Sequence, residues 1–249
     1  MAEPVQRWRI AFRRGAPALE LGPPEITRAW ERGLADAGIP VVMSAAARPR
    51  PRLMFAAPLP PGRVAEHDLV DIVLSERWPI SPVRSRLAAA LPPGFSIVEL
   101  YDVWVGAPSI TAALSAVSTR AVVRGAALVD LRSAVRAVLA AERLDRTRAK
   151  GSEQRIAYDL RPLVVDLEAG ALAWASALSE TAEADSTSIV RMVLRSSSDG
   201  PSGRPDEVIL ALGELLGREL ELVEQVRERI WTIDETPALG PLFQAVVAD

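Results

Sequence analysis

Three arginines alternate with two prolines in the run Arg48-Pro49-Arg50-Pro51-Arg52. Proline stiffens the backbone in an extended form, so the run holds three guanidinium groups near one another. A guanidinium binds phosphate or carboxylate through paired hydrogen bonds. The run therefore predicts an anion-binding surface, with RNA phosphate or an acidic protein face as the ligand; a solvated loop is the alternative.

Two further arginines, Arg13 and Arg14, end the first predicted strand. They extend the cationic patch if that strand lies beside the arginine–proline run. Basic patches matter for binding only where the charges are grouped in space. Arg13 and Arg14 are therefore candidate binding residues.

A second group of charged residues lies in the other half of the chain. Asp159 and Arg161 flank Leu160, so in a strand they project to one face and pair with each other or with a helix of the second domain. Arg204 and Asp206 stand at a predicted helix start, where an acid complements the helix dipole. We interpret both pairs as mainly structural.

His67 is the only histidine, and it stands among Glu66, Asp68 and Asp71. A carboxylate-oriented proton relay is one interpretation, and an exposed histidine at a strand start is the other. The chain has no cysteine, so it supplies no iron–sulfur ligand, thiolate zinc site or cysteine nucleophile. These residues predict no metal site and argue against an independent enzyme.

Composition is that of an ordinary soluble protein: 49% hydrophobic residues, 24% charged residues and a net charge of -3. No stretch approaches the roughly 20 apolar residues that span a bilayer, and the first residues lack the apolar core of a signal peptide. We therefore expect a cytoplasmic protein that does not enter a membrane.

The elements that must position these residues follow from periodicity. Trp8, Ile10 and Phe12 alternate with other residues as in a strand with one buried face, and a helix follows over 24–37. The next elements are expected to be two strands, a helix and a strand, at 52–57, 68–74, 82–91 and 95–105.

The same order recurs in the second half of the chain. We expect a strand, a helix, two strands, a helix and a strand at 120–124, 128–144, 154–167, 187–195, 205–216 and 219–232. Residues 169–186 are either a helix or a loose insertion. The repeat predicts an α+β fold of two tandem ferredoxin-like (βαββαβ) modules with antiparallel sheets, at residues 1–108 and 115–235, before a C-terminal tail at 236–249.

Several short segments, spread over most of the chain, stand in a distinctive order. They are Arg7-Trp8-Arg9-Ile10-Ala11-Phe12, Arg28 with Glu31-Arg32, Ala37-Gly38-Ile39-Pro40, Ser44, Pro49, Pro51, Pro58-Leu59-Pro60 with Gly62, Tyr158-Asp159-Leu160-Arg161-Pro162 and Gly203-Arg204-Pro205-Asp206-Glu207-Val208. In this order they resemble the DUF2344 family, also called radical SAM-linked proteins. The resemblance implies a radical SAM protein as partner, encoded beside or fused to such a chain.

Two departures from the family pattern bear on chemistry. Where the family usually has Leu-Ser-His-Leu-Asp, this chain has Pro23 at the histidine position and Glu25 at the acid position. Where the family usually has Asn-Pro-His-Pro, this chain has Arg48 and Arg50 in place of asparagine and histidine. If those histidines bind metal or move protons in relatives, this chain has lost that chemistry or replaced it with cationic binding.

These observations leave three hypotheses. The first is an accessory adaptor of a radical SAM enzyme. It binds no cofactor itself, because the enzyme carries the iron–sulfur cluster and S-adenosylmethionine. It docks either the substrate of that enzyme or the enzyme itself. The second is a stand-alone RNA-binding or RNA-modifying or processing protein that uses the arginine-rich loop. The third is a degenerate paralogue retained for interaction.

Overall fold

The structure is a computed structural model that describes residues 3–150, 154–171, 187–198 and 200–235. Its fold is α+β, with five α-helices in the described residues and strands that pair mostly antiparallel, which confirms the predicted α+β class. Contacts divide the chain into two units. The first contains residues up to Leu114 and those from Arg227 on, and the second is Ser115–Val226.

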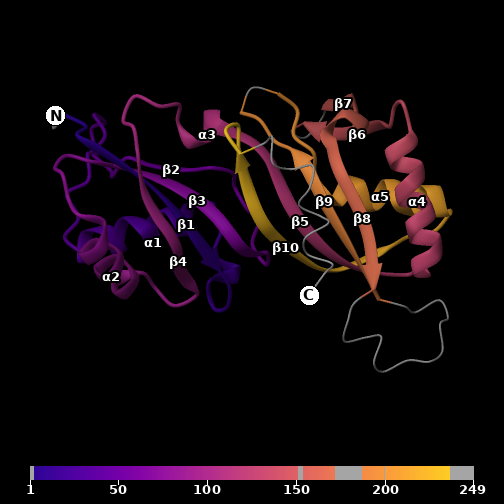
Figure 1. Ribbon diagram of the computed structural model, residues 1–249, viewed down its shortest axis with the longest axis horizontal. Helices are drawn as coiled ribbons and strands as arrows, with labels where there is room; N and C mark the ends of the chain where they lie inside the picture. The colour runs from indigo at the N-terminus through magenta and orange to yellow at the C-terminus, as the bar shows by residue number, and fades with distance from the viewer. Residues whose placement is uncertain (1–2, 151–153, 172–186, 199, 236–249) are drawn as a thin grey trace. The chain divides into compact units, whose positions relative to one another are not determined.

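The first unit is a sheet with two helices on one face (Figure 1). Its elements are β1 (Gln6–Arg14), the 3-10 turn η1 (Ala18–Glu20), α1 (Pro23–Asp36), β2 (Leu53–Phe55), β3 (Val64–Leu74), α2 (Ile80–Ala90), β4 (Phe95–Val103) and α3 (Ile110–Ala113). The strand order is β4-β1-β3, and β2 pairs with β3. β10, which belongs to this unit from Arg227 on, is also a neighbour of β3.

The alternating apolar residues of β1 form the core of this unit, as predicted. Trp8, Ile10 and Phe12 are buried against α1 and α2, and the Phe12 and Trp30 rings lie 4.8 Å apart between centroids. The intervening residues Arg7 and Arg9 therefore project to the face without these helices. Helix α1 ends before Gly38, whose φ of 64° is one that glycine adopts without strain.

The second unit has a sheet of four strands, two helices and a separate hairpin. Its elements are β5 (Leu114–Arg124), α4 (Leu128–Ala140), β6 (Asp145–Lys150), β7 (Gln154–Asp159), the 3-10 turn η2 (Arg161–Leu163), β8 (Val164–Ala171), β9 (Ser188–Arg195), α5 (Pro205–Leu216) and β10 (Glu221–Thr232). The strand order is β10-β5-β9-β8, while β6 and β7 pair only with each other. Helices α4 and α5 bury their apolar residues against this sheet (Figure 1).

Three sequence predictions differ from the structure. The single strand expected at 154–167 is two strands, β7 and β8, with a 3-10 turn around Pro162 between them, because proline cannot donate a hydrogen bond to a strand ladder. The strand expected at 120–124 begins earlier, at Leu114. β6 was not expected at all. Of the uncertain stretch 169–186, β8 takes the start, and residues 172–186 lie outside the described residues.

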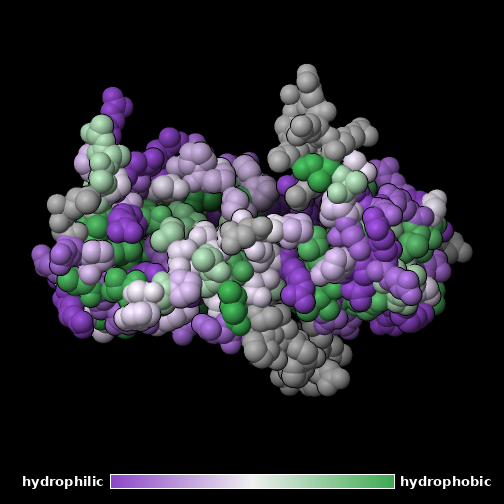
Figure 2. Space-filling model, turned by 90° about the horizontal axis from the view of Figure 1, so that it is seen from above, coloured by the Kyte–Doolittle hydropathy of each residue, from purple (hydrophilic) through white to green (hydrophobic). Residues whose placement is uncertain are grey.

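The surface mixes polar and apolar residues. On the face shown in Figure 2, hydrophilic and hydrophobic residues are interspersed. More than half of a folded protein's accessible surface is apolar, so scattered apolar residues need no partner to explain them. A binding surface is therefore indicated by grouped side chains and not by single apolar residues.

Candidate functional site

The arginine–proline run lies on a loop whose base is fixed by backbone hydrogen bonds. The Arg52 amide donates to the Val42 carbonyl at 2.9 Å, and the Ser44 amide donates to the Arg50 carbonyl at 2.8 Å. The Val42 amide donates in turn to the Val73 carbonyl of β3 at 2.8 Å. This loop, residues 42–52, is called the cationic loop below, and it is anchored to the sheet.

Arg50 ties the cationic loop to α1. Its Nε and Nη2 each donate to a carboxylate oxygen of Glu31 at 2.8 Å. This paired hydrogen bond raises the pKa of Arg50 above its ordinary value. Arg50 was predicted to bind an external anion, but the structure gives its guanidinium an internal carboxylate. Its position supports the loop instead.

All three arginines of the loop are exposed, but Arg50 is paired with Glu31, which leaves Arg48 and Arg52. Within the described residues, neither guanidinium has a hydrogen bond or an ion pair. Arg52 also lines a pocket of about 650 Å³ at the base of the loop. The other residues of this pocket are Glu3, Pro4, Val42, Met43, Ser44 and Ala45. The site therefore combines two available cations with a partly apolar hollow that also contains one carboxylate.

Arg13 and Arg14 do not extend this patch together. Arg13 is exposed, with its backbone opposite Ser96 of β4. Arg14 is only 1% exposed, and its guanidinium donates to the carbonyls of Arg63, Leu21 and Pro60 at 2.6 to 3.3 Å. Burial lowers the pKa of Arg14. The prediction that Arg14 offers a surface charge is therefore wrong, because β1 turns this side chain under the loop after β2.

A second buried arginine, Arg227 of β10, holds the same loop. It donates to the Asp68 carboxylate at 3.0 Å and to the carbonyls of Ala57 and Pro58, both at 3.1 Å. Proline has no amide N–H and so interrupts strand pairing, and the two guanidinium groups supply donors for carbonyls of this loop. The Pro58-Leu59-Pro60 motif thus has a structural explanation.

A third buried group, which sequence reasoning missed, lies on the face of the first unit's sheet opposite α1 and α2. Asp71 is fully buried and accepts two hydrogen bonds from Arg9, at 2.8 and 3.0 Å, and one from the Ile110 amide at 3.1 Å. Arg7 donates to the carbonyls of Ala107 and Pro108 at 3.0 and 3.1 Å. The signal was available, because Arg7 and Arg9 alternate with core residues and so share one strand face.

His67 lies in the first unit beside β10, and its Nδ1 accepts the Ile230 amide at 3.4 Å. Burial, and then the positive charge of Arg229, lower its pKa. Glu235, Asp68 and Glu99 oppose that shift. His67 is therefore a neutral side chain that accepts a hydrogen bond from a backbone amide and has a structural role. It is partly buried, so the interpretation as an exposed histidine is wrong.

The charged residues predicted in the second half have local partners. Asp159 accepts the amides of Leu144 at 2.8 Å and Arg161 at 3.0 Å, and the Leu144 bond chiefly lowers its pKa. The Arg161 guanidinium donates to the Leu139 carbonyl in the last turn of α4 and to the Val164 carbonyl. Asp159 and Arg161 therefore join α4 to the β7–β8 turn.

Arg204 and Asp206 are at the start of α5. Arg204 is the residue that precedes the helix, Pro205 is the first helical residue, and Asp206 lies in the first turn. The Arg204 side chain makes no capping hydrogen bond and is exposed. The cationic loop lies in the other unit.

No group of three or more acidic or histidine side chains in the described part of the chain is placed to hold a metal ion. The same part contains no helix with the length and apolarity needed to cross a bilayer. The chain also has no cysteine with which to ligate an iron–sulfur cluster.

The fold and the site can be compared with those of known proteins. No curated protein matches the chain. Two similar solved structures are crystal structures of a Cbf5-Nop10-Gar1 complex and of the archaeal box H/ACA sRNP Nop10-Cbf5 complex, with TM-scores of 0.48 and 0.45 and identities of 10% and 11%. Each alignment covers 92% of this chain and only 51% or 50% of the other, so this chain spans about half their length.

A protein-family model matches residues 7–205, which include β1, the cationic loop and the start of α5. The family is described as an uncharacterized protein conserved in bacteria. The match covers most of the chain and confirms the resemblance carried by its short motifs. The chain belongs to the DUF2344 family.

Proposed function

We propose that this chain is a cytoplasmic accessory protein of a radical SAM enzyme and that its cationic loop docks an acidic group of that enzyme or of its substrate. The observation that carries the proposal is the exposure of Arg48 and Arg52 on a loop fixed by backbone bonds and by the Arg50–Glu31 pair. A loop held in place before binding loses less conformational entropy when it binds.

The cofactors of the proposed pair belong to the partner. A radical SAM enzyme needs an iron–sulfur cluster and S-adenosylmethionine, and cluster ligation needs thiolates that this chain does not have. The role left to this chain is recognition, through charge and shape. A degenerate paralogue retained for interaction would act in the same way.

The architecture that presents the loop is proposed to be two ferredoxin-like modules, near residues 1–108 and 115–235, followed by a tail. In the first unit the βαββαβ elements give the order β4-β1-β3 with β2 on β3. In the second unit β5, α4, β8, β9, α5 and β10 give the order β10-β5-β9-β8. Each module places its first and third strands in the centre of the sheet, and the β6–β7 hairpin is an addition.

Single-stranded RNA is the second candidate ligand of the loop, because guanidinium groups bind phosphate as well as carboxylate. The two ligands differ in their salt response. Each phosphate contact releases counterions from the nucleic acid, so binding to RNA falls steeply with salt.

The test is binding of the purified full chain to a radical SAM protein from the same genome, with a 20-nucleotide oligouridylate as the RNA probe. Replacing Arg48 and Arg52 together by alanine should weaken the protein complex roughly thirtyfold at low salt, if each exposed charge contact contributes about 1 kcal/mol. Titration calorimetry at two salt concentrations measures the change.

The matched control is the double variant Arg77→Ala with Arg136→Ala, which removes two exposed charges elsewhere. This control should bind like the parent, and both variants should melt like the parent. Equal affinity of all three proteins for the radical SAM protein would contradict the proposal. Binding of the oligouridylate alone, sensitive to the same two arginines, would establish the RNA candidate instead.

A further inference from the structure

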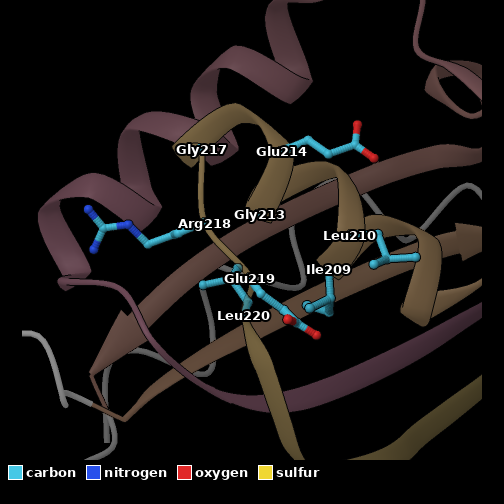
Figure 3. A pocket seen from close by; sticks show the side chains of 8 residues that line it. All are labelled: Ile209, Leu210, Gly213, Glu214, Gly217, Arg218, Glu219 and Leu220. Atoms are coloured by element: carbon cyan, nitrogen blue, oxygen red, sulfur yellow. The ribbon is translucent and has the colours of Figure 1, made fainter.

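The second unit has a pocket of about 430 Å³ where α5 ends and β10 begins (Figure 3). It is lined by Ile209, Leu210, Gly213, Glu214, Gly217, Arg218, Glu219 and Leu220. A pocket of this volume has room for one or two side chains of a partner, rather than for a large cofactor. It lies within one unit, and none of its residues was predicted as a site.

Two glycines shape the hollow: Gly213 lies inside α5, and Gly217 directly follows its last residue. A side-chain carbon at Gly213 would come within 2.7 Å of the Arg218 carbonyl, so the chain can turn back only over a glycine. Gly217 makes that turn, with a φ of 64°. The chain therefore folds closely against α5 and leaves an indentation beside it.

The walls of the hollow are aliphatic and one of them is open to solvent. Ile209 and Leu220 are buried, whereas Leu210 is 55% exposed. A surface helix usually presents polar residues on its outer side, but α5 has Leu210 there. An aliphatic side chain from a partner would cover this leucine and displace water from the hollow.

Two glutamates and one arginine stand at the mouth of the pocket. Figure 3 shows the Arg218 and Glu219 side chains leaving the turn in opposite directions, and Arg218 donates to the Gly125 carbonyl at 3.4 Å. Glu214 forms an ion pair with Arg146. Within the described residues, Glu219 has no hydrogen bond or ion pair for its side chain. The available charge beside the aliphatic wall is therefore a carboxylate.

We propose that this pocket docks a peptide segment of a partner protein in which aliphatic residues stand next to lysine or arginine. The aliphatic side chain would contact Ile209 and Leu210, and the basic side chain would pair with Glu219. An acidic ligand, such as the one proposed for the cationic loop, would meet the Glu219 carboxylate beside the aliphatic wall. The pocket is thus a second interaction site, independent of the first in both charge and location along the chain.

The experiment uses the full chain and three fluorescein-labelled peptides that differ only in the central four residues. These are Leu-Leu-Lys-Arg, Leu-Leu-Glu-Glu and Ser-Ser-Lys-Arg, each flanked by Gly-Ser on both sides. Fluorescence anisotropy should show saturable binding of the first peptide and at least about tenfold weaker binding of the other two. Absence of saturable binding by the first peptide, or equal binding by all three, would overturn the proposal.

Variants locate the site. Leu210→Ser and Glu219→Lys should each weaken binding of the Leu-Leu-Lys-Arg peptide about tenfold, and Glu219→Lys should strengthen binding of Leu-Leu-Glu-Glu. The controls are Leu215→Ser, at a leucine of the same helix that is 51% exposed but does not line the pocket, and Glu224→Lys on β10. Controls that weaken binding as much as the pocket variants would place the site elsewhere. Melting temperatures within a few degrees of the parent exclude unfolding as the cause.

Discussion

Asp71 balances buried positive charge in the first unit. It is fully buried, receives both hydrogen bonds of Arg9 and lies 3.7 Å from the Nε of Arg7. The Arg7 Nε is itself buried and has no hydrogen-bond partner. Removal of the only carboxylate in this group leaves two guanidinium groups in a poorly solvated place.

We therefore expect Asp71→Ala to lower the free energy of unfolding by about 3–5 kcal/mol. The loss should exceed that of any exposed carboxylate, for which about 0.5 kcal/mol is usual. Urea denaturation measures both values, with Glu76→Ala as the exposed control. Similar values for the two variants would show that Arg7 and Arg9 find solvent without Asp71.

His67 should make stability depend on pH. Its pKa in the folded protein lies below the ordinary 6.5, because of burial and then of Arg229. As the pH falls below about 6.5, the unfolded chain takes up a proton at this histidine before the folded protein does, so the free energy of unfolding falls. The slope from one such group is at most about 1.4 kcal/mol per pH unit.

His67→Gln removes that proton uptake. Between pH 7.5 and 5.5, the melting temperature of the variant should fall less than that of the parent. The lowered carboxyl pKa values of Asp159 and Glu235 act only at more acidic pH, so they do not interfere in this range. Parallel curves for the two proteins would assign the pH response to other groups.

At the scale of the elements, one arginine stabilises the C-terminal end of α4. Arg161 donates to the Leu139 carbonyl, which a helix terminus leaves without an internal partner. Its third bond, to the Val164 carbonyl at 2.8 Å, reaches the start of β8. The side chain thus connects a helix, a turn and a strand.

Arg161→Ala should therefore destabilise the protein by about 1–3 kcal/mol, since it leaves half-buried carbonyls without donors. Affinity for the proposed partner should not change. Arg161→Lys should recover only part of the loss, because an ammonium cannot reproduce the geometry of the guanidinium. Unfolding and binding measured on the same samples separate the two roles, and a loss of affinity without a loss of stability would make Arg161 a binding residue.

Element types were predictable where periodicity was strong. The apolar alternation of β1 and the helices α1, α4 and α5 follow from local spacing, and each matches the structure within a few residues. β6 has the sequence Asp-Arg-Thr-Arg-Ala-Lys, in which apolar residues do not alternate with polar ones, so it carries no such signal. Its strand form depends on pairing with β7, a partner that local sequence does not reveal.

The sequence predicted which residues form the candidate site, but it did not predict which partners their side chains contact. Charge and proline spacing identified the cationic loop, and the loop does expose Arg48 and Arg52. The sequence did not show that Arg50 forms hydrogen bonds with Glu31, which is 19 residues away. It also did not show that Arg14 is buried and donates to carbonyls up to 49 residues away. Such partners are fixed by tertiary contacts.

For the whole molecule, the proposal predicts a protein without its own metal. The chain has no cysteine and one histidine, and that histidine is engaged by a backbone amide. Elemental analysis of the purified chain should therefore show well below one equivalent of iron or zinc. Stoichiometric metal that remains bound after dialysis would require a site that the described residues do not provide. It would contradict the proposal that the chain acts only in recognition.

The division of β10 affects how the protein is made. The first unit takes residues from Arg227 on, and Arg227 carries the charge that neutralises buried Asp68. When the ribosome has synthesised the chain up to residue 114, most of this unit is present but Arg227 is not. More than a hundred further residues must be added before Arg227 can pair with Asp68. The first unit is thus completed only after the second has been synthesised, and a nascent chain stalled before residue 227 would expose an incomplete first unit to proteases and chaperones.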